Sequence, residues 1–227
     1  MVDEVSARSE ADRRFASDVS HELRSPLQTL SAATSVLDRR RDELDDRTAA
    51  AVDLLTDEVA RFESLVTDLL ELAKSDRPAE RRPTDVVALT RALLASRGLA
   101  PVVLDVSGGS AVLDVDPRRF EQVLANLVDN AAKHGGGAVR VGLAVEDDRL
   151  VLEVDDEGAG VPADERELVF DRFARGRAAS MRGGSDGTGL GLALVAQHVL
   201  AHRGSVVVLD RPGGGARFRV ELPVQAP

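Results

Sequence analysis

Apolar residues in the first third of the chain recur with the period of a helix. Between Phe15 and Leu37, and again between Val52 and Ala73, they return at steps of three or four positions. The second stripe alternates these steps without a break, which is typical of a coiled coil or a four-helix bundle. It consists of Val52, Leu55, Val59, Phe62, Val66, Leu69 and Ala73. The pattern predicts two helices joined by the charged segment 38–46.

A helical hairpin of this size is expected to need a partner. Its two stripes enclose too little apolar surface to hold one pair of helices together in water. Two hairpins from two chains would bury both stripes as a four-helix bundle. The sequence therefore predicts a homodimer.

The pattern changes beyond the second stripe. Residues 77–83 contain Pro78, Pro83 and several charges without a period, so they are interpreted as a linker between two domains, 1–76 and 84–227. In the second domain, short apolar runs predict strands and longer periodic runs predict helices. The strands are expected over 102–106, 111–115, 138–145, 150–154, 205–209 and 216–222, and the helices over 86–96, 117–134 and 190–202. This order favours an α/β sandwich, with helices on one face of a mixed sheet.

Composition narrows the class of protein. Of the 227 residues, 43% are hydrophobic, which is enough for a buried core, and none is cysteine, which excludes disulfides and thiolate metal sites. A formal charge of -10 and 3% aromatic residues argue against nucleic-acid binding, which depends on basic surface and stacking. No apolar run approaches the roughly 20 residues needed to cross a bilayer.

A histidine lies on the polar side of the first predicted helix. His21 is two positions from both Val19 and Leu23, so it points away from the apolar stripe and is expected to be exposed. Pro26 cannot donate a backbone hydrogen bond, so the helix is expected to bend just after the histidine. Glu22 can hold one imidazole nitrogen as N–H, which leaves the other as a nucleophile for a phosphoryl group. For a lone His-Glu pair, a solvated helix face is the simpler explanation.

Four polar side chains share one face of the predicted helix 117–134. They are Asn126, Asn130, Lys133 and His134. Amide oxygens suit Mg²⁺ that nucleotide phosphates already hold, and Lys133 can neutralise phosphate charge. The end of an amphipathic helix, stopped by the glycines at 135–137, accounts for the same residues equally well.

Two glycine motifs follow this helix. Asp156, Gly158 and Gly160 come after a predicted strand, where the backbone can approach a ligand and the carboxylate can accept a hydrogen bond from an adenine amino group. The second motif opens a helix and places backbone N–H groups where polyphosphate binds. It consists of Gly187, Thr188, Gly189, Leu190 and Gly191. Between the two motifs, the segment 175–186 is interpreted as a lid. An acidic turn and a helix N-cap are the structural alternatives for the two motifs.

The order of these motifs resembles the catalytic core of bacterial two-component sensor histidine kinases, over nearly the whole chain. The matching segments are 20–27 for the family's H box, 126–134 for its N box, 156–160 for its G1 box, 170–173 for its F box and 187–192 for its G2 box. The resemblance implies a dimerisation and phosphotransfer hairpin that forms a dimeric four-helix bundle. It also implies a Bergerat-type (GHKL) α/β sandwich that binds ATP, the fold shared with gyrase B, Hsp90 and MutL.

The same resemblance implies a role for each motif residue. His21 is the phosphoacceptor, and Glu22 is its acid-base and orienting partner. Asn130 is a ligand of Mg²⁺, Asp156 reads adenine, and Lys133 binds phosphate together with the second glycine motif. The other implied nucleotide ligands are Asn126, His134, Gly158 and Gly160. The cofactors are ATP and Mg²⁺, and the phosphoryl group passes from His21 to an aspartate on the receiver domain of a response regulator.

One position departs from the family pattern. Related H boxes often carry Thr or Asn three residues after the acidic residue, where it helps to position water for dephosphorylating the regulator, and Ser25 occupies that place. A hydroxyl is retained, so a phosphatase role for Ser25 stays open.

Two other classes of function compete with the kinase. A different enzyme on the same ATP fold, such as a protein-serine kinase or an ATP-driven clamp, is disfavoured by His21 on a dimerising hairpin. A degenerate kinase kept as a binding scaffold is disfavoured by the intact Asn130 and Asp156. Few residues precede His21, so we expect a cytoplasmic core that is either a fragment of a longer, membrane-anchored receptor or the partner of a separate sensor.

Overall fold

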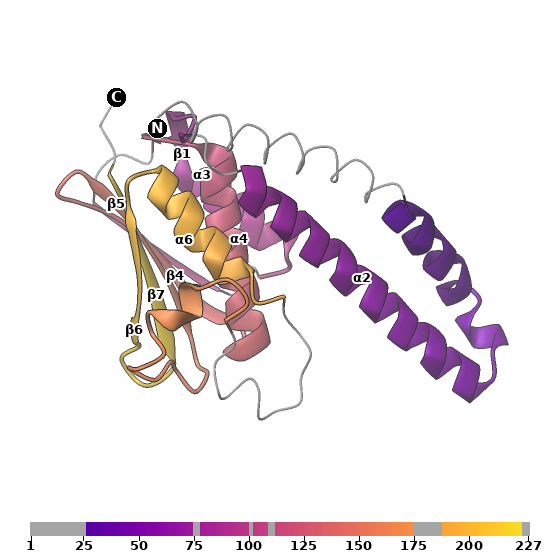
Figure 1. Cartoon of the computed structure of the whole chain (residues 1–227). Helices are drawn as coiled ribbons and strands as arrows, with labels where there is room; N and C mark the ends of the chain where they lie inside the picture. The colour runs from indigo at the N-terminus through magenta and orange to yellow at the C-terminus, as the bar shows by residue number, and fades with distance from the viewer. Residues whose placement is uncertain (1–25, 75–77, 100–101, 109–111, 175–187, 224–227) are drawn as a thin grey trace, which may run out of the picture. The chain divides into compact units, whose positions relative to one another are not determined.

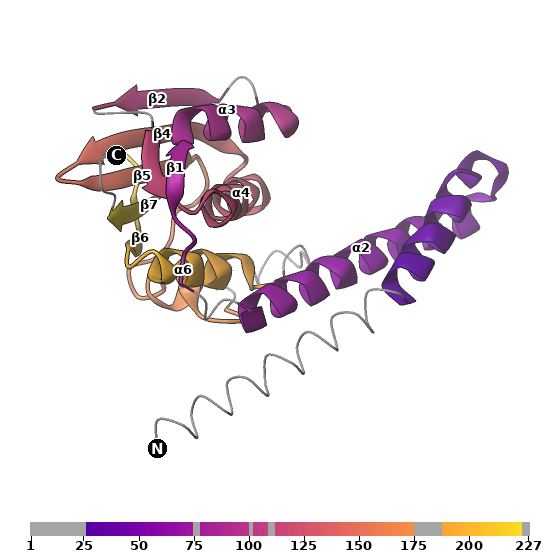
Figure 2. The ribbon, with the colours of Figure 1, turned by 90° about the horizontal axis from the view of Figure 1, so that it is seen from above.

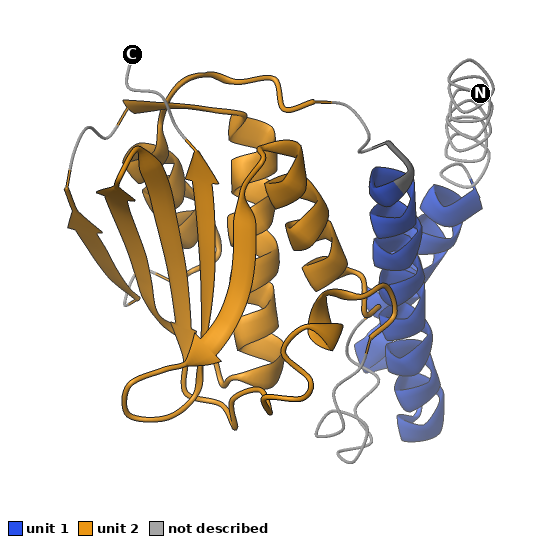
Figure 3. Ribbon diagram, turned by 60° about the vertical axis from the view of Figure 1, so that its left-hand side comes forward, with its two compact units in different colours: residues 1–74 blue, residues 75–227 orange. Residues whose placement is uncertain are grey.

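The computed structural model describes residues 26–74, 78–99, 102–108, 112–174 and 188–223. The chain divides into two compact units, residues 1–74 and residues 75–227 (Figure 3). Each unit has its own secondary structure and its own buried residues, so each is described by itself. Within the described ranges, no helix is both long enough and apolar enough to cross a membrane.

The described part of the N-terminal unit is a helical hairpin. A helix over residues 26–38 leads through a short 3-10 helix, η1 (Arg41–Glu43), into the long helix α2 (Asp46–Lys74) (Figure 1). Asp45 begins α2 by accepting hydrogen bonds from the hydroxyl of Thr48 at 2.6 Å and from its backbone N–H at 3.1 Å. These bonds lower the pKa of the Asp45 carboxyl. The predicted pair of helices is confirmed over the described residues.

The apolar stripe of α2 divides into two sets with a spacing of seven residues. The buried set consists of Val52, Val59 and Val66. The exposed set consists of Leu55, Phe62 and Leu69, which are 48, 47 and 39% exposed. A spacing of seven keeps each set on one line along the helix. Of the stripe positions whose burial the structure describes, the single chain therefore buries half.

The C-terminal unit is an α/β sandwich built on a five-stranded mixed sheet. The strand order is β2-β4-β5-β7-β6, in which β2 and β4 are parallel and the other neighbours are antiparallel. These strands are β2 (Val103–Ser107), β4 (Ala138–Glu146), β5 (Arg149–Asp156), β6 (Ser205–Asp210) and β7 (Ala216–Pro223). A separate antiparallel pair joins β1 (Arg82–Asp85) to β3 (Val112–Val115). The predicted fold class, helices followed by an α/β sandwich, is confirmed.

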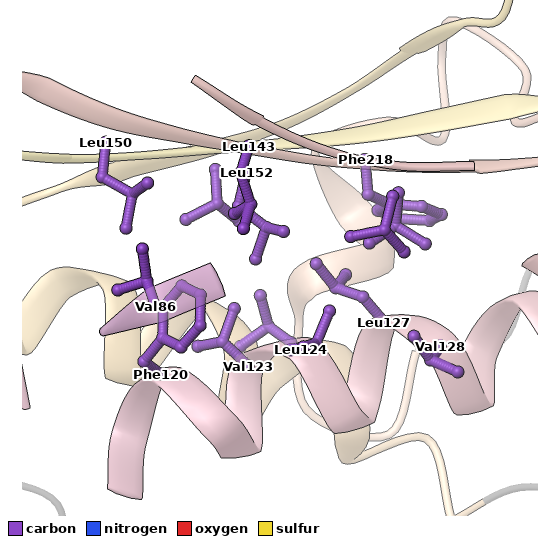
Figure 4. Close-up of a cluster of buried hydrophobic side chains, with 14 of the residues drawn as sticks. Val86, Phe120, Val123, Leu124, Leu127, Val128, Leu143, Leu150, Leu152 and Phe218 are labelled. Atoms are coloured by element: carbon purple, nitrogen blue, oxygen red, sulfur yellow. The ribbon is translucent and has the colours of Figure 1, made fainter. Parts of the chain in front are cut away.

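Among the described residues, helices from three parts of the C-terminal unit cover one face of the five-stranded sheet (Figure 2). They are α3 (Val86–Ser96), α4 (Pro117–His134) and α6 (Gly191–Ala201), and α4 contacts both of the others. The apolar side of α4 faces the sheet and forms the centre of the core (Figure 4). Buried members of this core include Phe120, Leu124, Leu127, Leu152 and Phe218. Because this side of α4 is fixed in the core, its polar side is held away from the sheet.

Local capping fixes where α4 begins. Pro117 occupies the first turn, where its missing N–H is not needed. The Oδ1 atom of Asp116 accepts hydrogen bonds from the backbone N–H groups of Arg118 at 3.1 Å and Arg119 at 3.2 Å. The register of the helix, and with it the position of Asn126, is set at this cap.

Strand β1 begins inside the segment interpreted as a linker, which corrects the extent of that segment. Arg82 and Pro83 pair with Val115 and Asp114. An edge strand tolerates proline, because only alternate residues direct their N–H groups at the partner strand. The four residues of β1 show no apolar alternation, so the hydrophobic pattern gives no sign of this strand.

The other face of the five-stranded sheet carries ion pairs. Asp155 accepts hydrogen bonds from Nε and Nη2 of Arg217, both at 2.7 Å, and is only 2% exposed. Glu153 accepts from Arg140 at 2.9 Å and from Arg219 at 3.1 Å. The bond to Asp155 raises the pKa of the Arg217 guanidinium. Side chains alternate along a strand, so Asp155 lies on this face and the next residue, Asp156, lies on the helix face.

Candidate functional site

Asp156, the last residue of β5, is held by the backbone of two segments. Its side chain is 4% exposed. The Oδ1 atom accepts hydrogen bonds from the backbone N–H groups of Gly158 at 2.9 Å and Ala216 at 3.0 Å. Among the described residues, the Oδ2 atom has no hydrogen-bond partner. A carboxylate with one oxygen anchored in this way can present the other to a hydrogen-bond donor on a ligand.

Three glycines allow the backbone to close around Asp156. A β-carbon at Gly135 would lie 2.3 Å from its Cγ atom, and one at Gly158 would lie 2.7 Å from the α-carbon of Gly135. A β-carbon at Gly215 would lie 2.0 Å from the carbonyl oxygen of Asp156. The end of α4, the turn after β5 and the turn before β7 therefore meet at one carboxylate.

We expect Gly215→Ala to destabilise the C-terminal unit about twice as much as Gly214→Ala. Both glycines have a positive φ, +99° and +100°, so each alanine carries a strain of about 1–2 kcal/mol. Only the β-carbon at position 215 also meets backbone, whereas nothing lies within 4 Å of one at position 214. That clash adds about 1–3 kcal/mol. Thermal unfolding of the two variants measures the difference, and equal losses would contradict the close approach to Asp156.

The predicted polar face of α4 lies beside the start of α6. Asn126 is half-buried, and its Oδ1 atom would lie 3.7 Å from a β-carbon at Gly191. Its Nδ2 atom is buried and has no hydrogen-bond partner among the described residues. Asn130 is half-buried, and Lys133 and His134 are exposed. A buried amide without a partner is costly, and an acceptor on a ligand would remove that cost.

The second glycine motif begins α6. Gly189 has a φ of +69°, and its carbonyl accepts a hydrogen bond from the backbone N–H of Phe173 at 2.9 Å. The hydroxyl of Thr188 accepts one from the N–H of Leu190 at 3.3 Å. Leu190 is the N-cap of α6 and has no side-chain oxygen to bind the N–H groups of the first turn. These N–H groups, which follow at Gly191 and beyond, suit an anion instead.

The two phenylalanines between the glycine motifs have different environments. Phe170 packs edge-on against Phe218, with ring centroids 6.4 Å apart and an interplanar angle of 86°. Phe173 is 57% exposed and has a φ of +63°. Phe170 therefore belongs to the core, whereas Phe173 is fixed mainly through its backbone bond to the glycine motif.

Several predicted site residues lie outside the described residues. They are His21, Glu22, Ser25, Gly187 and the segment 175–186. The structure places Gly158 against Asp156, and Asn126 against the start of α6, and both contacts belong to the C-terminal unit.

The turn before β7 also belongs to the site, although no sequence motif predicted it. Arg211 donates a hydrogen bond to the carbonyl of Gly214 at 3.1 Å, and its guanidinium lies 3.2 Å from the carboxylate of Glu157. Together with Gly215 and Ala216, this arginine holds the turn against Asp156. The available signal was the run of three glycines at 213–215, but such a run is also found in ordinary loops.

Two family models match the chain. Residues 11–78 match the His Kinase A (phospho-acceptor) domain. Residues 115–226 match the histidine kinase-, DNA gyrase B-, and HSP90-like ATPase. The two matches cover both units of the structure.

Curated relatives are similar to this chain over almost its whole length. The signal transduction histidine-protein kinase AfsQ2 of Streptomyces coelicolor is 37% identical over 236 residues, which cover 98% of this chain and 44% of the relative. The sensor histidine kinase MtrB of Mycobacterium tuberculosis is 35% identical over 222 residues, which cover 93% of this chain and 39% of the relative. The chain thus spans less than half the length of these curated relatives.

Solved structures of similar proteins share the fold. Full-length ShkA in complex with AMPPNP is 26% identical with a TM-score of 0.71, covering 94% of this chain and 46% of that protein. The mycobacterial sensor histidine kinase MprB is 29% identical with a TM-score of 0.51, covering 65% of this chain and 99% of that one. The chain therefore belongs to the bacterial two-component histidine kinases and comprises the ATP-binding catalytic core of that family.

Proposed function

We propose that the chain binds ATP with Mg²⁺ in its C-terminal unit, transfers the γ-phosphoryl group to His21, and passes it to an aspartate of a response regulator. The main support for a nucleotide site is the geometry of Asp156. One carboxylate oxygen is anchored by two backbone N–H groups, and the other is left for a donor such as the adenine amino group. An anchored acceptor of this kind discriminates between bases because its orientation is fixed.

The remaining nucleotide contacts follow from the other segments at the site. The N–H groups at the start of α6 would bind phosphate oxygens, and the exposed Lys133 would neutralise their charge. The amide oxygen of Asn130 would complete the coordination of Mg²⁺, a hard cation that prefers oxygen ligands. The Nδ2 atom of Asn126, which has no hydrogen-bond partner within the described ranges, would donate to a phosphate or to bound water. Magnesium would supply charge neutralisation on the phosphates as they transfer.

The phosphoryl transfer itself needs little acid-base help. A neutral imidazole nitrogen of His21 would attack the γ-phosphorus, a nitrogen–phosphorus bond would form, and the bond to the bridging oxygen would break to release ADP. Glu22 would accept a hydrogen bond from the other ring nitrogen as positive charge develops there. In the second transfer, a carboxylate oxygen of the regulator's aspartate takes the phosphoryl group and the histidine becomes neutral again. Ser25 is the residue proposed to act in dephosphorylating the regulator.

The exposed apolar line on α2 supports a homodimer. Leu55, Phe62 and Leu69 repeat every seven residues and are between 39 and 48% exposed in the single chain. Two such lines from two hairpins would pack together as in a four-helix bundle. We propose that this assembly acts in the cytoplasm.

Chemical stability of the protein-bound phosphate tests the proposed function. We expect the purified chain, incubated with γ-labelled ATP and Mg²⁺, to acquire a label that acid removes and alkali does not. Phosphohistidine contains a nitrogen–phosphorus bond, which becomes labile when the nitrogen is protonated. An acid-stable label would instead indicate a serine or threonine kinase, and nucleotide turnover without any label would indicate an ATP-driven clamp.

A further inference from the structure

A cluster of buried and half-buried polar residues joins α4, α6 and the start of the C-terminal unit. We call it the polar junction, and it consists of Arg81, Asp116, Arg119, His198 and His202. Asp116, His198 and His202 are 7, 2 and 1% exposed. The polar junction lies at the N-terminal end of α4 and the C-terminal end of α6. The proposed nucleotide site lies toward the opposite ends of both helices. Burying an ionisable group destabilises the fold unless the group forms hydrogen bonds or ion pairs. The contacts within the junction therefore show what these residues hold in place.

His202 connects the two helices through both nitrogens of its ring. Its Nε2 atom accepts a hydrogen bond from the backbone N–H of Asp116, the N-cap of α4, at 3.1 Å. Its Nδ1 atom donates to the carbonyl of His198, one turn earlier in α6, at 2.8 Å. Burial lowers the pKa of His202, and burial together with the guanidinium of Arg119 lowers the pKa of His198 to about 4. Both rings are therefore neutral at neutral pH, as one donor and one acceptor on His202 require.

The chain that leads into the C-terminal unit is fixed to the same residues. The backbone N–H of Glu80 donates to Oδ2 of Asp116 at 2.9 Å. The guanidinium of Arg81 donates to the carbonyl of His202 and, at 3.0 Å, to the carbonyl of Pro223. A cation at the last carbonyls of a helix is also favoured by the helix dipole. The junction thus holds the end of the linker, the start of α4 and the end of α6 in one arrangement.

The two helices run antiparallel with a fixed register. Nη1 of Arg119 lies 3.4 Å from Nδ1 of His198 at the junction end. At the other end Asn126 faces Gly191, the first residue of α6. The step from Arg119 to Asn126 along α4 is as long as the step from His198 back to Gly191 along α6. Both contacts therefore belong to one register, and a change at one end shifts the other.

We propose that His202 is a positioning residue for the nucleotide site. Its bond to the start of α4 sets the angle between α4 and α6, and hence the placement of Asn126 and Asn130 against the first turn of α6. The proposal rests on the proposed function, because it assigns the nucleotide to these two helices. Helix α6 has 11 residues and is roughly 16 Å long, so a tilt of about 5° at the junction moves Gly191 by roughly 1.4 Å. A displacement of about 1 Å is enough to disturb a reacting geometry on the order of 100-fold.

Variants that retain different hydrogen bonds of His202 distinguish a positioning role from a contribution to general stability. In the full chain, we expect His202→Ala and His202→Asn to weaken ATP binding roughly tenfold. Asparagine can still donate to the carbonyl of His198 but does not reach Asp116. His202→Gln places an acceptor near the N–H of Asp116 and should stay within about threefold of wild type. Isothermal titration with ATP and Mg²⁺ measures the affinity, and thermal unfolding without nucleotide measures stability.

A buried apolar substitution in the same unit is the matched control. Val220→Ala removes packing on β7, where the side chain is fully buried, without touching the junction. If Val220→Ala lowers ATP affinity as much as His202→Asn at an equal loss of melting temperature, His202 acts only structurally and the positioning role is overturned. Should His202→Ala fail to fold, Arg81→Ala decides, because it removes only bonds to two carbonyls. We expect that variant to weaken ATP binding about threefold, and an unchanged affinity would overturn the proposal. A wild-type chain that binds no ATP would contradict the proposed function itself.

Discussion

A His21→Gln chain will bind ATP as tightly as the wild type and will acquire no acid-labile phosphate. Glutamine is similar in size to histidine, but its amide nitrogen is not nucleophilic and cannot form the nitrogen–phosphorus bond. The two measurements respond separately because His21 belongs to the N-terminal unit and the nucleotide site belongs to the C-terminal unit. Label incorporation from γ-labelled ATP and equilibrium binding of ATP are both required. An acid-labile label that persists in this variant would place the acceptor elsewhere.

Mixing this variant with Asp156→Asn, at an ATP concentration too low to fill the weakened site, shows which chain of the dimer is phosphorylated. His21→Gln keeps the nucleotide site, and Asp156→Asn keeps the acceptor histidine. In mixed dimers, label on the Asp156→Asn chain means that ATP bound to one chain phosphorylates its partner. No label on either chain means that each chain phosphorylates itself. Unmixed chains would also carry no label, so the formation of mixed dimers is checked separately by pull-down through a tag on one variant.

The second large effect is expected for Asp156→Asn, which should weaken ATP binding roughly 100-fold, or about 3 kcal/mol. The amide oxygen can take over the bonds from Gly158 and Ala216, but the amide nitrogen then stands where an acceptor for adenine is needed. If the amide is flipped, its N–H groups face two backbone N–H donors, which is equally unfavourable. The affinity for GTP should fall less, since guanine has a carbonyl oxygen at the position of the adenine amino group. Calorimetric titration with both nucleotides measures the two changes.

The preceding residue offers a matched control for that change. Asp155→Asn makes the same substitution one position earlier, on the face of the sheet where Arg217 covers the carboxylate. It should lower the melting temperature through the weakened ion pair and leave ATP affinity within about twofold of wild type. Equal losses of affinity in the two variants would mean that Asp156 acts through the stability of β5 and does not contact adenine.

Elements with strong local signals could be predicted from the sequence. The helix predicted over 117–134 is found over Pro117–His134, because Asp116 and Pro117 start it and Gly135 ends it within a few residues. The order of strands and helices in the second domain is sufficient to predict a mixed sheet with helices on one face. The resemblance of five ordered motifs was sufficient for the family.

Contacts between distant segments could not be predicted in this way. The N–H of Ala216 reaches Asp156 across sixty positions, and no periodicity relates the two residues. Strand β1 could not be predicted, because its pairing with β3 depends on backbone geometry and not on an apolar pattern. The stripe on α2 was visible, but which of its positions the hairpin buries depends on the crossing of the two helices. That is a property of three-dimensional packing.

The hairpin of β4 and β5 turns tightly at Asp147 and Asp148, both with positive φ, and its register runs unbroken from that turn to Asp155, opposite Arg140, and shifts by one residue before Asp156. A single residue inserted into β5 would exchange the faces of Asp155 and Asp156, because side chains alternate with a period of two. Two inserted residues would keep the faces but carry Asp156 about 7 Å along the sheet, away from Ala216. The number of residues between the turn and Asp156 is therefore constrained twice. An odd change would move Asp156 to the other face, and an even change would move it along the strand. Evolution can vary its sequence freely only while the number of residues between the turn and Asp156 stays the same.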